Sequence, residues 1–472
     1  MTFEEVKSYF EENEIEMVDF KVIDVNGRMK HLTIPAARFT EDTMTYGIGF
    51  DGSNYGYAAV EKSDMVFVPD LNTLALEPYA DLPTATMFGD VYVIGAENTP
   101  FDQYPRNVAR AAVSYMKQTG AADRVDLGPE FEFYVFDNVN FKAQPQGAGY
   151  NIDCEYAEWN TGMEVNHGYQ IPHHGGYHAA LPQDFSYNMR SRVCALLEEN
   201  GCPVKYHHTE VGGPGQVEIE VAFGELTDMA DRTMLVKYFV MNQAMCEGYT
   251  ATFMPKPIYK EAGNGMHVHI ILSKDGQPVF FDEKGYSQLS DTALYFIGGL
   301  CRHAASLCGI TNPSTNSYKR LVPGFEAPVT IGYATANRSA IVRIPAYAKA
   351  PKDKRFELRN PDATCNPYYA YAAILMAGLD GIEKKIDPSK NGWGPYDYNL
   401  FALSDEEKAK VQGLPHSLEE ALDALEADHE YLTKGGVFPE VLIKNWIRAK
   451  RADAAELNAF PHPLEFTKYY TL

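Results

Sequence analysis

Carboxylates and histidines recur at a spacing of two residues in segments that are otherwise rich in β-formers. The segments are Glu-Phe-Glu-Phe (130–133), Gln-Val-Glu-Ile-Glu-Val (216–221), Met-His-Val-His (266–269) and Arg-Phe-Glu-Leu-Arg (355–359). Side chains at i and i+2 of a β-strand point to one face, so each segment predicts polar groups on one face and apolar groups on the other. A face with this many carboxylates repels itself unless cations lie among them. Oxygen-rich ligands with one imidazole favour Mg²⁺ or Mn²⁺.

Two other histidine-rich segments allow more than one interpretation. In His-His-Gly-Gly-Tyr-His (173–178) the histidines have no spaced carboxylates beside them, so we expect a loop of hydrogen-bonded histidines, with a metal site as the alternative. The pair His-His (207–208) is followed by Glu210 and then by the turn Gly-Gly-Pro-Gly (212–215). This turn predicts that Glu210 and Glu218 lie on opposite sides of a tight loop, within reach of one ion.

Between Lys319 and Arg359 the sign of the charge reverses. Nine basic residues stand against three acidic ones there, a net charge of +6. Arginine binds phosphate and carboxylate oxygens in bidentate pairs, and arginines alternate with apolar residues in this segment. Divalent cations held by carboxylates beside an arginine cluster are what phosphoryl transfer requires. The residues alone therefore predict an Mg²⁺-nucleotide enzyme with an anionic substrate.

The composition of the whole chain limits the class of protein. Its 472 residues favour two or three domains, and 45% hydrophobic with 22% charged residues is typical of a globular protein with a large core. The formal charge of −23 argues against nucleic acid and anionic membranes as partners. The acidic N-terminus is unlike a signal peptide, and the most apolar stretch, 368–378, is shorter than a membrane span. Seven cysteines without a C-x-x-C motif predict reduced thiols and a cytoplasmic protein.

Local signals predict a small β-rich unit followed by a larger alternation of strands and helices. Thr2 and Glu5 form a capping box, and Asn26-Gly27 predicts a hairpin after the alternating strand 18–22. Further strands are expected at 64–69 and 90–94, and the unit ends near the turn at 98–100. Helices are then expected from Pro105 and at 184–200, 228–249, 291–308 and 367–382, and beyond residue 403 the chain is expected to be helical.

The segment Gly-Ile-Gly-Phe-Asp-Gly (47–52) fits G-x-G-x-x-G but not its required setting. It follows the polar run 38–46 and leads into Ser-Asn-Tyr-Gly (53–56), whereas a dinucleotide fingerprint follows a buried strand and opens a helix. We therefore expect no dinucleotide site here. The sequence also contains no P-loop motif.

Seven motifs follow one another along nearly the whole chain. They are Phe-Asp-Gly-Ser (50–53), Glu-Phe-Glu-Phe (130–133), His-His-Thr-Glu-Val-Gly-Gly-Pro-Gly-Gln-Val-Glu (207–218), Gly-Met-His-Val-His (265–269), Leu-Val-Pro-Gly-Phe-Glu-Ala-Pro (321–328), Asn-Arg-Ser-Ala (337–340) and Arg-Phe-Glu-Leu-Arg (355–359). Together, and in this order, they resemble the motifs of type I glutamine synthetase.

The resemblance implies an α+β fold with two domains. Residues 1–103 would form an N-terminal β-grasp domain, and residues 104–472 a catalytic domain with a curved antiparallel β-sheet backed by helices. Subunits would assemble into a dodecamer of two hexameric rings, with each active site between subunits. A small regulatory protein is a further possible partner.

The resemblance also implies roles for individual residues. The ligands of one metal would be Glu132, Glu210 and Glu218. The ligands of a second would be Glu130, His267 and Glu357. The glutamate site would contain Gly263, Arg320, Arg338 and Arg359. The ATP site would contain Phe223, His269, Arg343, Lys352 and Arg355. The catalytic residues would be the flap Glu326, Arg338, and the ammonium-site residues Asp51 (from a neighbouring subunit), Asp64 and Tyr177.

The implied reaction has two steps and uses ATP with two to three Mg²⁺ or Mn²⁺ ions. The γ-carboxylate of glutamate attacks the γ-phosphate of ATP, and ammonia then displaces phosphate from γ-glutamyl phosphate to give glutamine. Four positions depart from the family pattern: Ala262 stands where an asparagine is usual, Asn54 and Ile271 replace serines, and Phe401 replaces the tyrosine of adenylylated enzymes. We therefore expect no regulation by adenylylation.

Two alternatives remain open on the sequence alone. A γ-glutamyl-amine ligase would use the same chemistry with a polyamine or ethanolamine, but such relatives tend to lose the ammonium-site carboxylates, whereas Asp51 and Asp64 are present here. A catalytically inactive structural or regulatory homologue would have lost metal carboxylates, and here all of them are present.

Overall fold

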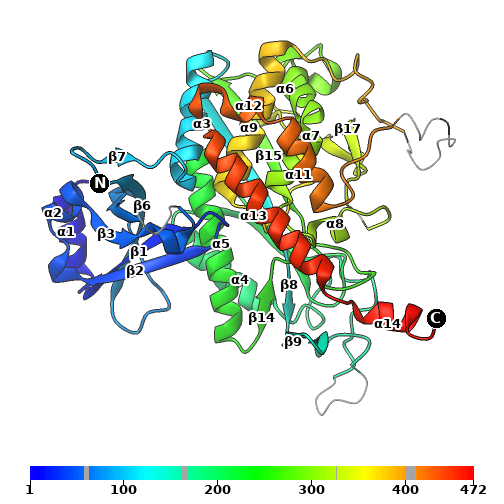
Figure 1. Ribbon diagram of the computed structural model, residues 1–472, viewed down its shortest axis with the longest axis horizontal. Coiled ribbons are helices and arrows are strands. Elements are labelled where there is room, and N and C mark those ends of the chain that lie inside the picture. Colours follow the sequence, from blue (N-terminus) through cyan, green and yellow to red (C-terminus); the bar gives the residue numbers. More distant parts are fainter. Residues whose placement is uncertain (58–62, 161–166, 326, 399–405, 407–410) are drawn as a thin grey trace.

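The computed structural model describes residues 1–57, 63–160, 167–325, 327–398, 406 and 411–472. The described residues have two main hydrophobic cores, a small one built from residues 6–104 and a large one that draws mostly on residues after 104, besides two minor clusters. In Figure 1 the N-terminal part (blue) lies to one side of the larger body, in which helices surround a sheet. The arrangement confirms the α+β class.

The N-terminal part is a seven-stranded sheet with the order β2-β1-β6-β4-β3, to which β5 and β7 add at β6. Its strands are β1 (Met17–Ile23), β2 (Met29–Pro35), β3 (Ile48–Asp51), β4 (Asp64–Pro69), β5 (Ala75–Leu76), β6 (Thr84–Val93) and β7 (Thr99–Pro100). Its helices are α1 (Phe3–Glu12), which has the predicted capping box, and α2 (Glu41–Tyr46). The strand expected at 90–94 begins earlier, at Thr84, because β6 lies between β1 and β4 and is buried on both faces, which removes the alternation.

The predicted hairpin between β1 and β2 also fixes the N-terminal part against the rest of the chain. Gly27 has φ 76°, and a Cβ there would lie 2.7 Å from the Cα of Asn366, so the turn requires glycine. The side chain of Asn366 donates hydrogen bonds to the carbonyls of Asp24 and Val25 and accepts one from the N–H of Tyr368. Asn366 is thus both the N-cap of the buried helix α9 (Pro367–Lys384) and a contact between the N-terminal part and the larger part.

The segment 47–52 has the structure expected from the sequence. Residues 41–46 form α2, and β3 then leads into a short 3₁₀ helix, Gly52–Tyr55, rather than into an α-helix. The segment therefore lacks the strand–turn–helix setting of a dinucleotide site.

The larger part contains a ten-stranded mixed sheet with the order β11-β12-β8-β15-β19-β18-β17. The strands in this order are β8 (Arg124–Phe136), β11 (Val204–Thr209), β12 (Gln216–Val221), β15 (Met266–Lys274), β17 (Thr330–Thr335), β18 (Ala340–Ile344) and β19 (Phe356–Leu358). Short strands β13 (Gly224–Glu225), β14 (Thr250–Thr252) and β16 (Gln277–Pro278) pair at its sides. The expected antiparallel pairing fails at one place, where β17 and β18 are parallel.

Helices pack against the apolar face of this sheet and against one another. They are α3 (Pro105–Thr119), α4 (Tyr187–Glu199), α5 (Leu226–Cys246), α6 (Asp291–Arg302), α7 (Ala304–Thr311), α8 (Ser317–Arg320), α9 (Pro367–Lys384), α11 (Leu418–Ala427), α12 (Glu430–Thr433), α13 (Glu440–Ala459) and α14 (Pro463–Tyr469). Other 3₁₀ turns are Ala36–Arg38, Leu71–Thr73, Tyr286–Gln288, Pro351–Asp353 and Lys434–Gly436. Helix α9 is buried along almost its whole length, which explains the apolar run at 368–378.

The helix expected at 291–308 is broken at His303, where α6 and α7 meet at 73°. His303 is 3% exposed, and its two ring nitrogens contact Asp428 at 2.8 Å and Asp380 at 3.0 Å. Lys434 donates to Asp380 at 2.7 Å, and the ring of Tyr431 stacks 4.0 Å from that of His303. We call these five residues the histidine clamp, because they tie α6, α7, α9, α11 and α12 together.

No single helix in the described ranges is long and apolar enough to cross a membrane. The bent pair α6 and α7 passes the same test of length and composition only when its two helices are taken together. Both helices contribute buried residues to the large core.

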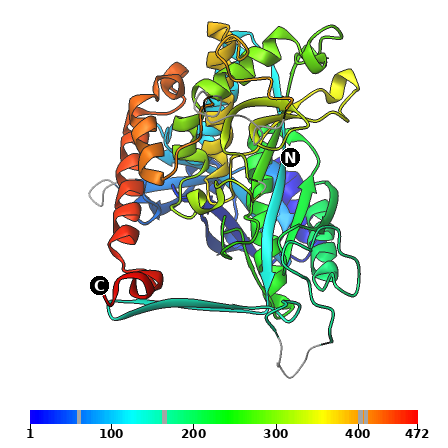
Figure 2. The same cartoon turned by 90° about the vertical axis from the view of Figure 1, so that its right-hand side faces the viewer.

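One element stands apart from both cores. Strands β9 (Asn138–Gln144) and β10 (Gly147–Asp153) form a two-stranded hairpin, and every residue of β9 is exposed. Figure 2 shows the hairpin projecting from the body.

Candidate active site

Strand register brings the predicted polar residues into one patch on the central sheet. Glu218 of β12 lies opposite Glu132 of β8 on one side and opposite His208 of β11 on the other. Glu130 of β8 lies opposite His267 of β15. The alternate residues, such as Phe131 and Ile219, are fully buried in the large core. The two-residue spacing therefore sorts acids and apolar groups onto opposite faces, as expected from the sequence.

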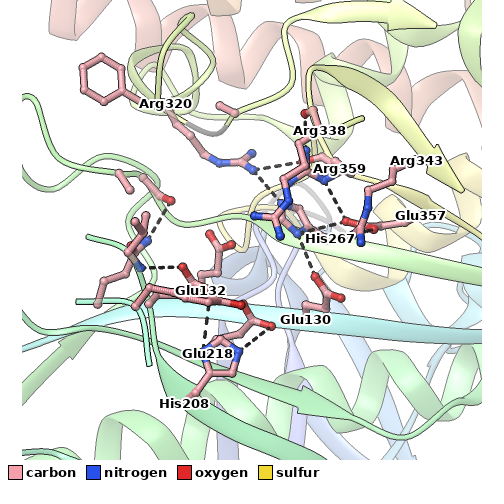
Figure 3. A pocket seen from close by; sticks show the side chains of 18 of the residues that line it. Glu130, Glu132, His208, Glu218, His267, Arg320, Arg338, Arg343, Glu357 and Arg359 are labelled. Atoms are coloured by element: carbon pink, nitrogen blue, oxygen red, sulfur yellow. Dashed lines mark hydrogen bonds and ion pairs between the residues drawn. The ribbon is translucent and has the colours of Figure 1, made fainter. Parts of the chain in front are cut away.

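A first group of potential metal ligands consists of Glu130, His267 and Glu357. One ligand atom from each lies within 4.8 Å of the others. The Nδ1 atom of His267 is 2.9 Å from a carboxylate oxygen of Glu130 and 3.4 Å from one of Glu357 (Figure 3). Two carboxylates and one imidazole at this separation match the donor set that Mg²⁺ or Mn²⁺ uses.

A second group lies beside it and consists of His208, Glu210 and Glu218, again within 4.8 Å. His208 is 3.9 Å from a carboxylate oxygen of each of the two glutamates. Glu132 faces the same cavity and accepts a hydrogen bond of 2.5 Å from the N–H of Gly265. The tight turn 212–215 does bring Glu210 and Glu218 together.

The pKa values in this patch show that negative charge is in excess. Burial raises the pKa of Glu218 well above its usual value, and the nearby Glu130, Glu132 and Glu210 raise it further. Burial also disfavours the charged form of Glu130, but hydrogen bonds from His267 and His269 hold its pKa well below the usual range. A divalent cation among these oxygens would remove the repulsion on Glu218, so the residues present fit such an ion.

Arginines form the other wall of the same cavity. Arg343 and Arg359 both bond to the carboxylate of Glu357, at 2.6 and 2.9 Å. Arg320 is 2% exposed and donates to the backbone carbonyls of residues 359–361. Arg338 also lines the cavity (Figure 3). Metal-competent carboxylates and guanidinium groups thus face one another across a single cavity.

The segment around Gly263 closes the cavity between these walls. A Cβ on Gly263 would lie 2.4 Å from the carbonyl oxygen of Pro255 and 2.8 Å from the Cγ of Arg320, so only glycine fits. The Gly263 carbonyl accepts a hydrogen bond of 3.0 Å from the side chain of Gln216. The carbonyl of Ala262, the residue that departs from the family pattern, accepts one of 2.7 Å from the buried Tyr134.

A group of aromatic and basic side chains adjoins the first metal group. His269 is fully buried, contacts Glu130 at 2.8 Å and has its ring 6.3 Å from that of Phe223. The Arg355 guanidinium lies 5.4 Å from the Phe223 ring and 5.5 Å from the Tyr347 ring. Nδ1 of His269 and Nε of Arg355 are buried without a hydrogen-bond partner in the described part of the chain. Buried ring and guanidinium nitrogens without a partner beside an aromatic ring suit a polar planar ligand.

Several of the expected site residues lie elsewhere or cannot be placed. Asp51 and Asp64 are register partners on β3 and β4, both exposed, in the N-terminal part. Lys352 is exposed in the short 3₁₀ turn before β19. Tyr177, by contrast, lines the cavity. Glu326 and Phe401 fall outside the described residues.

Several cavity residues were not singled out from the sequence. His208, which the sequence leaves open between a metal ligand and a hydrogen-bonded histidine, stands two residues before Glu210, the same spacing as in the other polar pairs. Gln216, 2% exposed, stands two residues before Glu218 on the same strand face. Tyr206 and Tyr347 also line the cavity. Extending the two-residue rule along each strand would have found His208, Gln216 and Tyr206; no such pattern marks Tyr347.

Comparison with known proteins places this arrangement in a family. The profile described as "Glutamine synthetase, catalytic domain" matches residues 102–469, and the one described as "Glutamine synthetase, beta-Grasp domain" matches residues 14–94. The chain belongs to the glutamine synthetase family. The family resemblance and the β-grasp fold of the N-terminal part are thereby confirmed.

Relatives that match over nearly the whole chain include proteins with different names. A glutamine synthetase of Streptomyces filamentosus is 46% identical over 474 residues, covering 99% of both chains. A protein of Cupriavidus pinatubonensis named 3-hydroxylaminophenol mutase is 43% identical over 472 residues, with 99% of each chain covered. Among solved structures, Plasmodium falciparum glutamine synthetase superposes with a TM-score of 0.90 at 27% identity and covers 100% of this chain and 99% of its own.

Proposed function

We propose that this glutamine synthetase family member is a ligase that joins ammonia to the γ-carboxylate of glutamate, using ATP and forming glutamine, ADP and phosphate. One observation carries the proposal: an excess of buried carboxylates and a wall of arginines share one cavity. The full-length likeness to glutamine synthetases supports the same reaction. The seven free thiols support a cytoplasmic location.

The first step is proposed to be attack of the glutamate γ-carboxylate on the γ-phosphorus of ATP. This step brings two anions together, and Arg338, Arg343 and Arg355 are proposed to bind the phosphates. Arg320, Arg359 and the backbone at Gly263 are proposed to hold glutamate on the opposite side. Two to three Mg²⁺ or Mn²⁺ ions, held by the two ligand groups, would supply positive charge for the phosphate oxygens.

The nucleotide is proposed to bind beside the first metal group. Phe223 offers an aromatic face, and His269 and Arg355 offer the buried nitrogens without a partner. Lys352 is exposed, three residues before Arg355, and is proposed to reach a phosphate from outside the cavity. Glu326 is proposed to close the glutamate side and keep water from the acyl phosphate.

The second step is proposed to need a neighbouring copy of the chain. Asp51 lies on the edge strand β3 of the N-terminal sheet and faces Asp64 of β4, whereas Tyr177 lines the cavity. An adjacent subunit would bring its carboxylate to the cavity, where it would take a proton from ammonium so that ammonia displaces phosphate. The ring-shaped dodecamer, the domain boundary at 103–104 and a small regulatory partner are proposed on the family likeness.

The deciding experiment measures ADP release with glutamate and each of three acceptors in Mg²⁺. We expect turnover with ammonium and little with spermidine or ethanolamine. Turnover with an organic amine and none with ammonium would contradict the proposal and favour a γ-glutamyl-amine ligase. No ADP release with any acceptor would instead favour an inactive homologue.

A further inference from the structure

The loop of histidines at 173–178 meets a carboxylate that the sequence does not place beside it. Glu261 lies in the segment between β14 and β15, and its carboxylate contacts Nδ1 of His173. One ligand atom each from His173, His174 and Glu261 lies within 4.8 Å of the others. The carboxylate missing from the sequence pattern is therefore supplied by the fold.

We infer that His173, His174 and Glu261 form a separate binding site for a divalent metal ion that prefers imidazole ligands, such as Zn²⁺ or Co²⁺. The set has two imidazoles and one carboxylate, whereas the cavity groups each have two carboxylates and one imidazole. Imidazole-rich sets favour Zn²⁺ and its neighbours over Mg²⁺. Three protein ligands leave a position for water, as in open zinc sites.

The surroundings of the Glu261 carboxylate favour a bound cation. Glu261 is 2% exposed, yet its Oε2 atom is buried without a hydrogen-bond partner in the described ranges. The nearby ammonium of Lys256 donates to the backbone carbonyl of Glu261, so it holds the segment without taking the carboxylate. A buried carboxylate oxygen without a donor is unfavourable, and a bound cation would satisfy it.

The two histidines are also oriented for binding. Nε2 of His174 lies 2.9 Å from the carbonyl oxygen of Lys260, to which it donates, and this leaves the ring lone pair on Nδ1. Ligating histidines typically have this second hydrogen bond to a carbonyl. His174 has φ 55°, and the adjacent turn places the two rings 4.0 Å apart at 83°. His173 has 47% of its side chain exposed, so an ion can enter from solvent.

Occupation of this site would join two segments that line the candidate active site. The loop 171–178 carries Tyr177, and Glu261 immediately precedes Ala262 and Gly263. An ion bound by both segments would stabilise the folded chain by a free energy that rises with the logarithm of its free concentration once that concentration exceeds the Kd.

The test uses the full chain, stripped of metal and then saturated with Mg²⁺, and titrates it with Co²⁺ followed by visible absorption and calorimetry. We expect the wild type to bind one more Co²⁺ per chain than His173→Gln or His174→Gln, and Glu261→Gln to bind that ion at least tenfold more weakly. His416→Gln, which changes an exposed histidine elsewhere, serves as the matched control and should behave as wild type. Equal Co²⁺ stoichiometry and affinity in wild type and both histidine variants would overturn the inference.

A second measurement covers the case in which the variants fail to fold. Wild-type chain in Mg²⁺ is treated with diethyl pyrocarbonate with and without Zn²⁺, and modification of each histidine is followed by mass spectrometry. We expect Zn²⁺ to protect His173 and His174 at least fivefold and to leave His416 unchanged. Equal modification of His173 and His174 with and without Zn²⁺ would overturn the inference.

Discussion

The histidine clamp in the helical layer and the carboxylate patch on the central sheet both bury charge, but only the clamp balances it. In the clamp, Asp380 and Asp428 bond to His303, and Asp380 also bonds to Lys434. Burial disfavours the charged form of Asp380, but hydrogen bonds from His303, Lys434 and Lys384 outweigh it and hold its pKa well below its usual value. In the patch, the pKa of Glu218 moves the opposite way.

The difference distinguishes a structural charge network from a binding site. A network that supplies its own counter-charges is complete in the folded chain and needs no ligand. A network with surplus carboxylates has a folded state that an added cation would stabilise. Five predictions test this distinction, in order of expected size.

The largest effect is expected from Glu218→Gln. The amide keeps the shape but not the charge, so we expect turnover to fall about 10³-fold, about 4 kcal/mol of barrier. The metal-free variant should be at least as stable as wild type, because repulsion from Glu130, Glu132 and Glu210 is relieved. Steady-state ADP release and thermal unfolding in a chelator measure the two effects, with Glu199→Gln on the exposed face of α4 as control. Normal turnover would remove Glu218 from the site.

In the clamp we expect the opposite result, because His303→Ala should lower stability and leave turnover unchanged. The buried Asp380 would keep only its lysine partners, the partly exposed Asp428 would lose the imidazole, and a cavity would form, so we expect a loss of about 3 kcal/mol in the free energy of unfolding. Turnover of the folded fraction should stay near wild type, because the clamp lies in the helical layer behind the sheet. Chemical denaturation measures the loss, with His416→Gln as control. A variant as stable as wild type but impaired in turnover would contradict a purely structural role for the clamp.

Removal of divalent metal should lower stability through the patch and leave the clamp unaffected. At a free ion concentration about 100 times the Kd, the loss is about 2.7 kcal/mol.

The pH dependence of stability distinguishes the carboxylate patch from the histidine clamp. In metal-free protein the raised pKa of Glu218 gives stability below about pH 4.5 that is lost as pH rises through the folded-state pKa, whereas bound metal removes this loss. Stability curves at several pH values with and without Mg²⁺ measure it; identical curves would contradict a metal site.

His303 gives its own pH dependence, which metal should not change. Burial lowers its pKa, but bonds to Asp380 and Asp428 raise it above the usual 6.5. Its contribution is therefore complete below about pH 6.5 and is lost as pH rises through the folded-state pKa. His303→Ala should abolish this part of the pH dependence in both metal states. A pH profile that His303→Ala leaves unchanged would show that another group is responsible.

The smallest effect is expected at the edge of the clamp. Lys434 is partly exposed and pairs with Asp380 and Glu383, so Lys434→Gln should cost about 0.5–1 kcal/mol. Chemical denaturation at low and high salt measures this, and salt should reduce the difference. A loss as large as that of His303→Ala would show that Lys434, not the imidazole, is the main counter-charge.

The sequence could predict the patch better than the clamp for a physical reason. A strand with one polar face has a two-residue period, so the sequence alone could place Glu130 and His267 on the polar faces of their strands. The clamp joins His303, Asp380 and Asp428 across three helices, and no local period records which helices pack together. The same limit applies to Glu261, which only the fold brings to the loop at 173–178. The single helix expected at 291–308 was wrong because an apolar helical period does not reveal a bend.

The cross-strand register of the patch has a consequence for how such a chain can change. Each strand contributes alternate residues, so any one side chain can be exchanged without moving the others. Insertion or deletion of one residue within β8 would instead rotate Glu130 and Glu132 into the core and bring Phe131 to the cavity. Variation in these strands is thus open to substitution and closed to changes of length, whereas the exposed hairpin β9–β10 can lengthen freely.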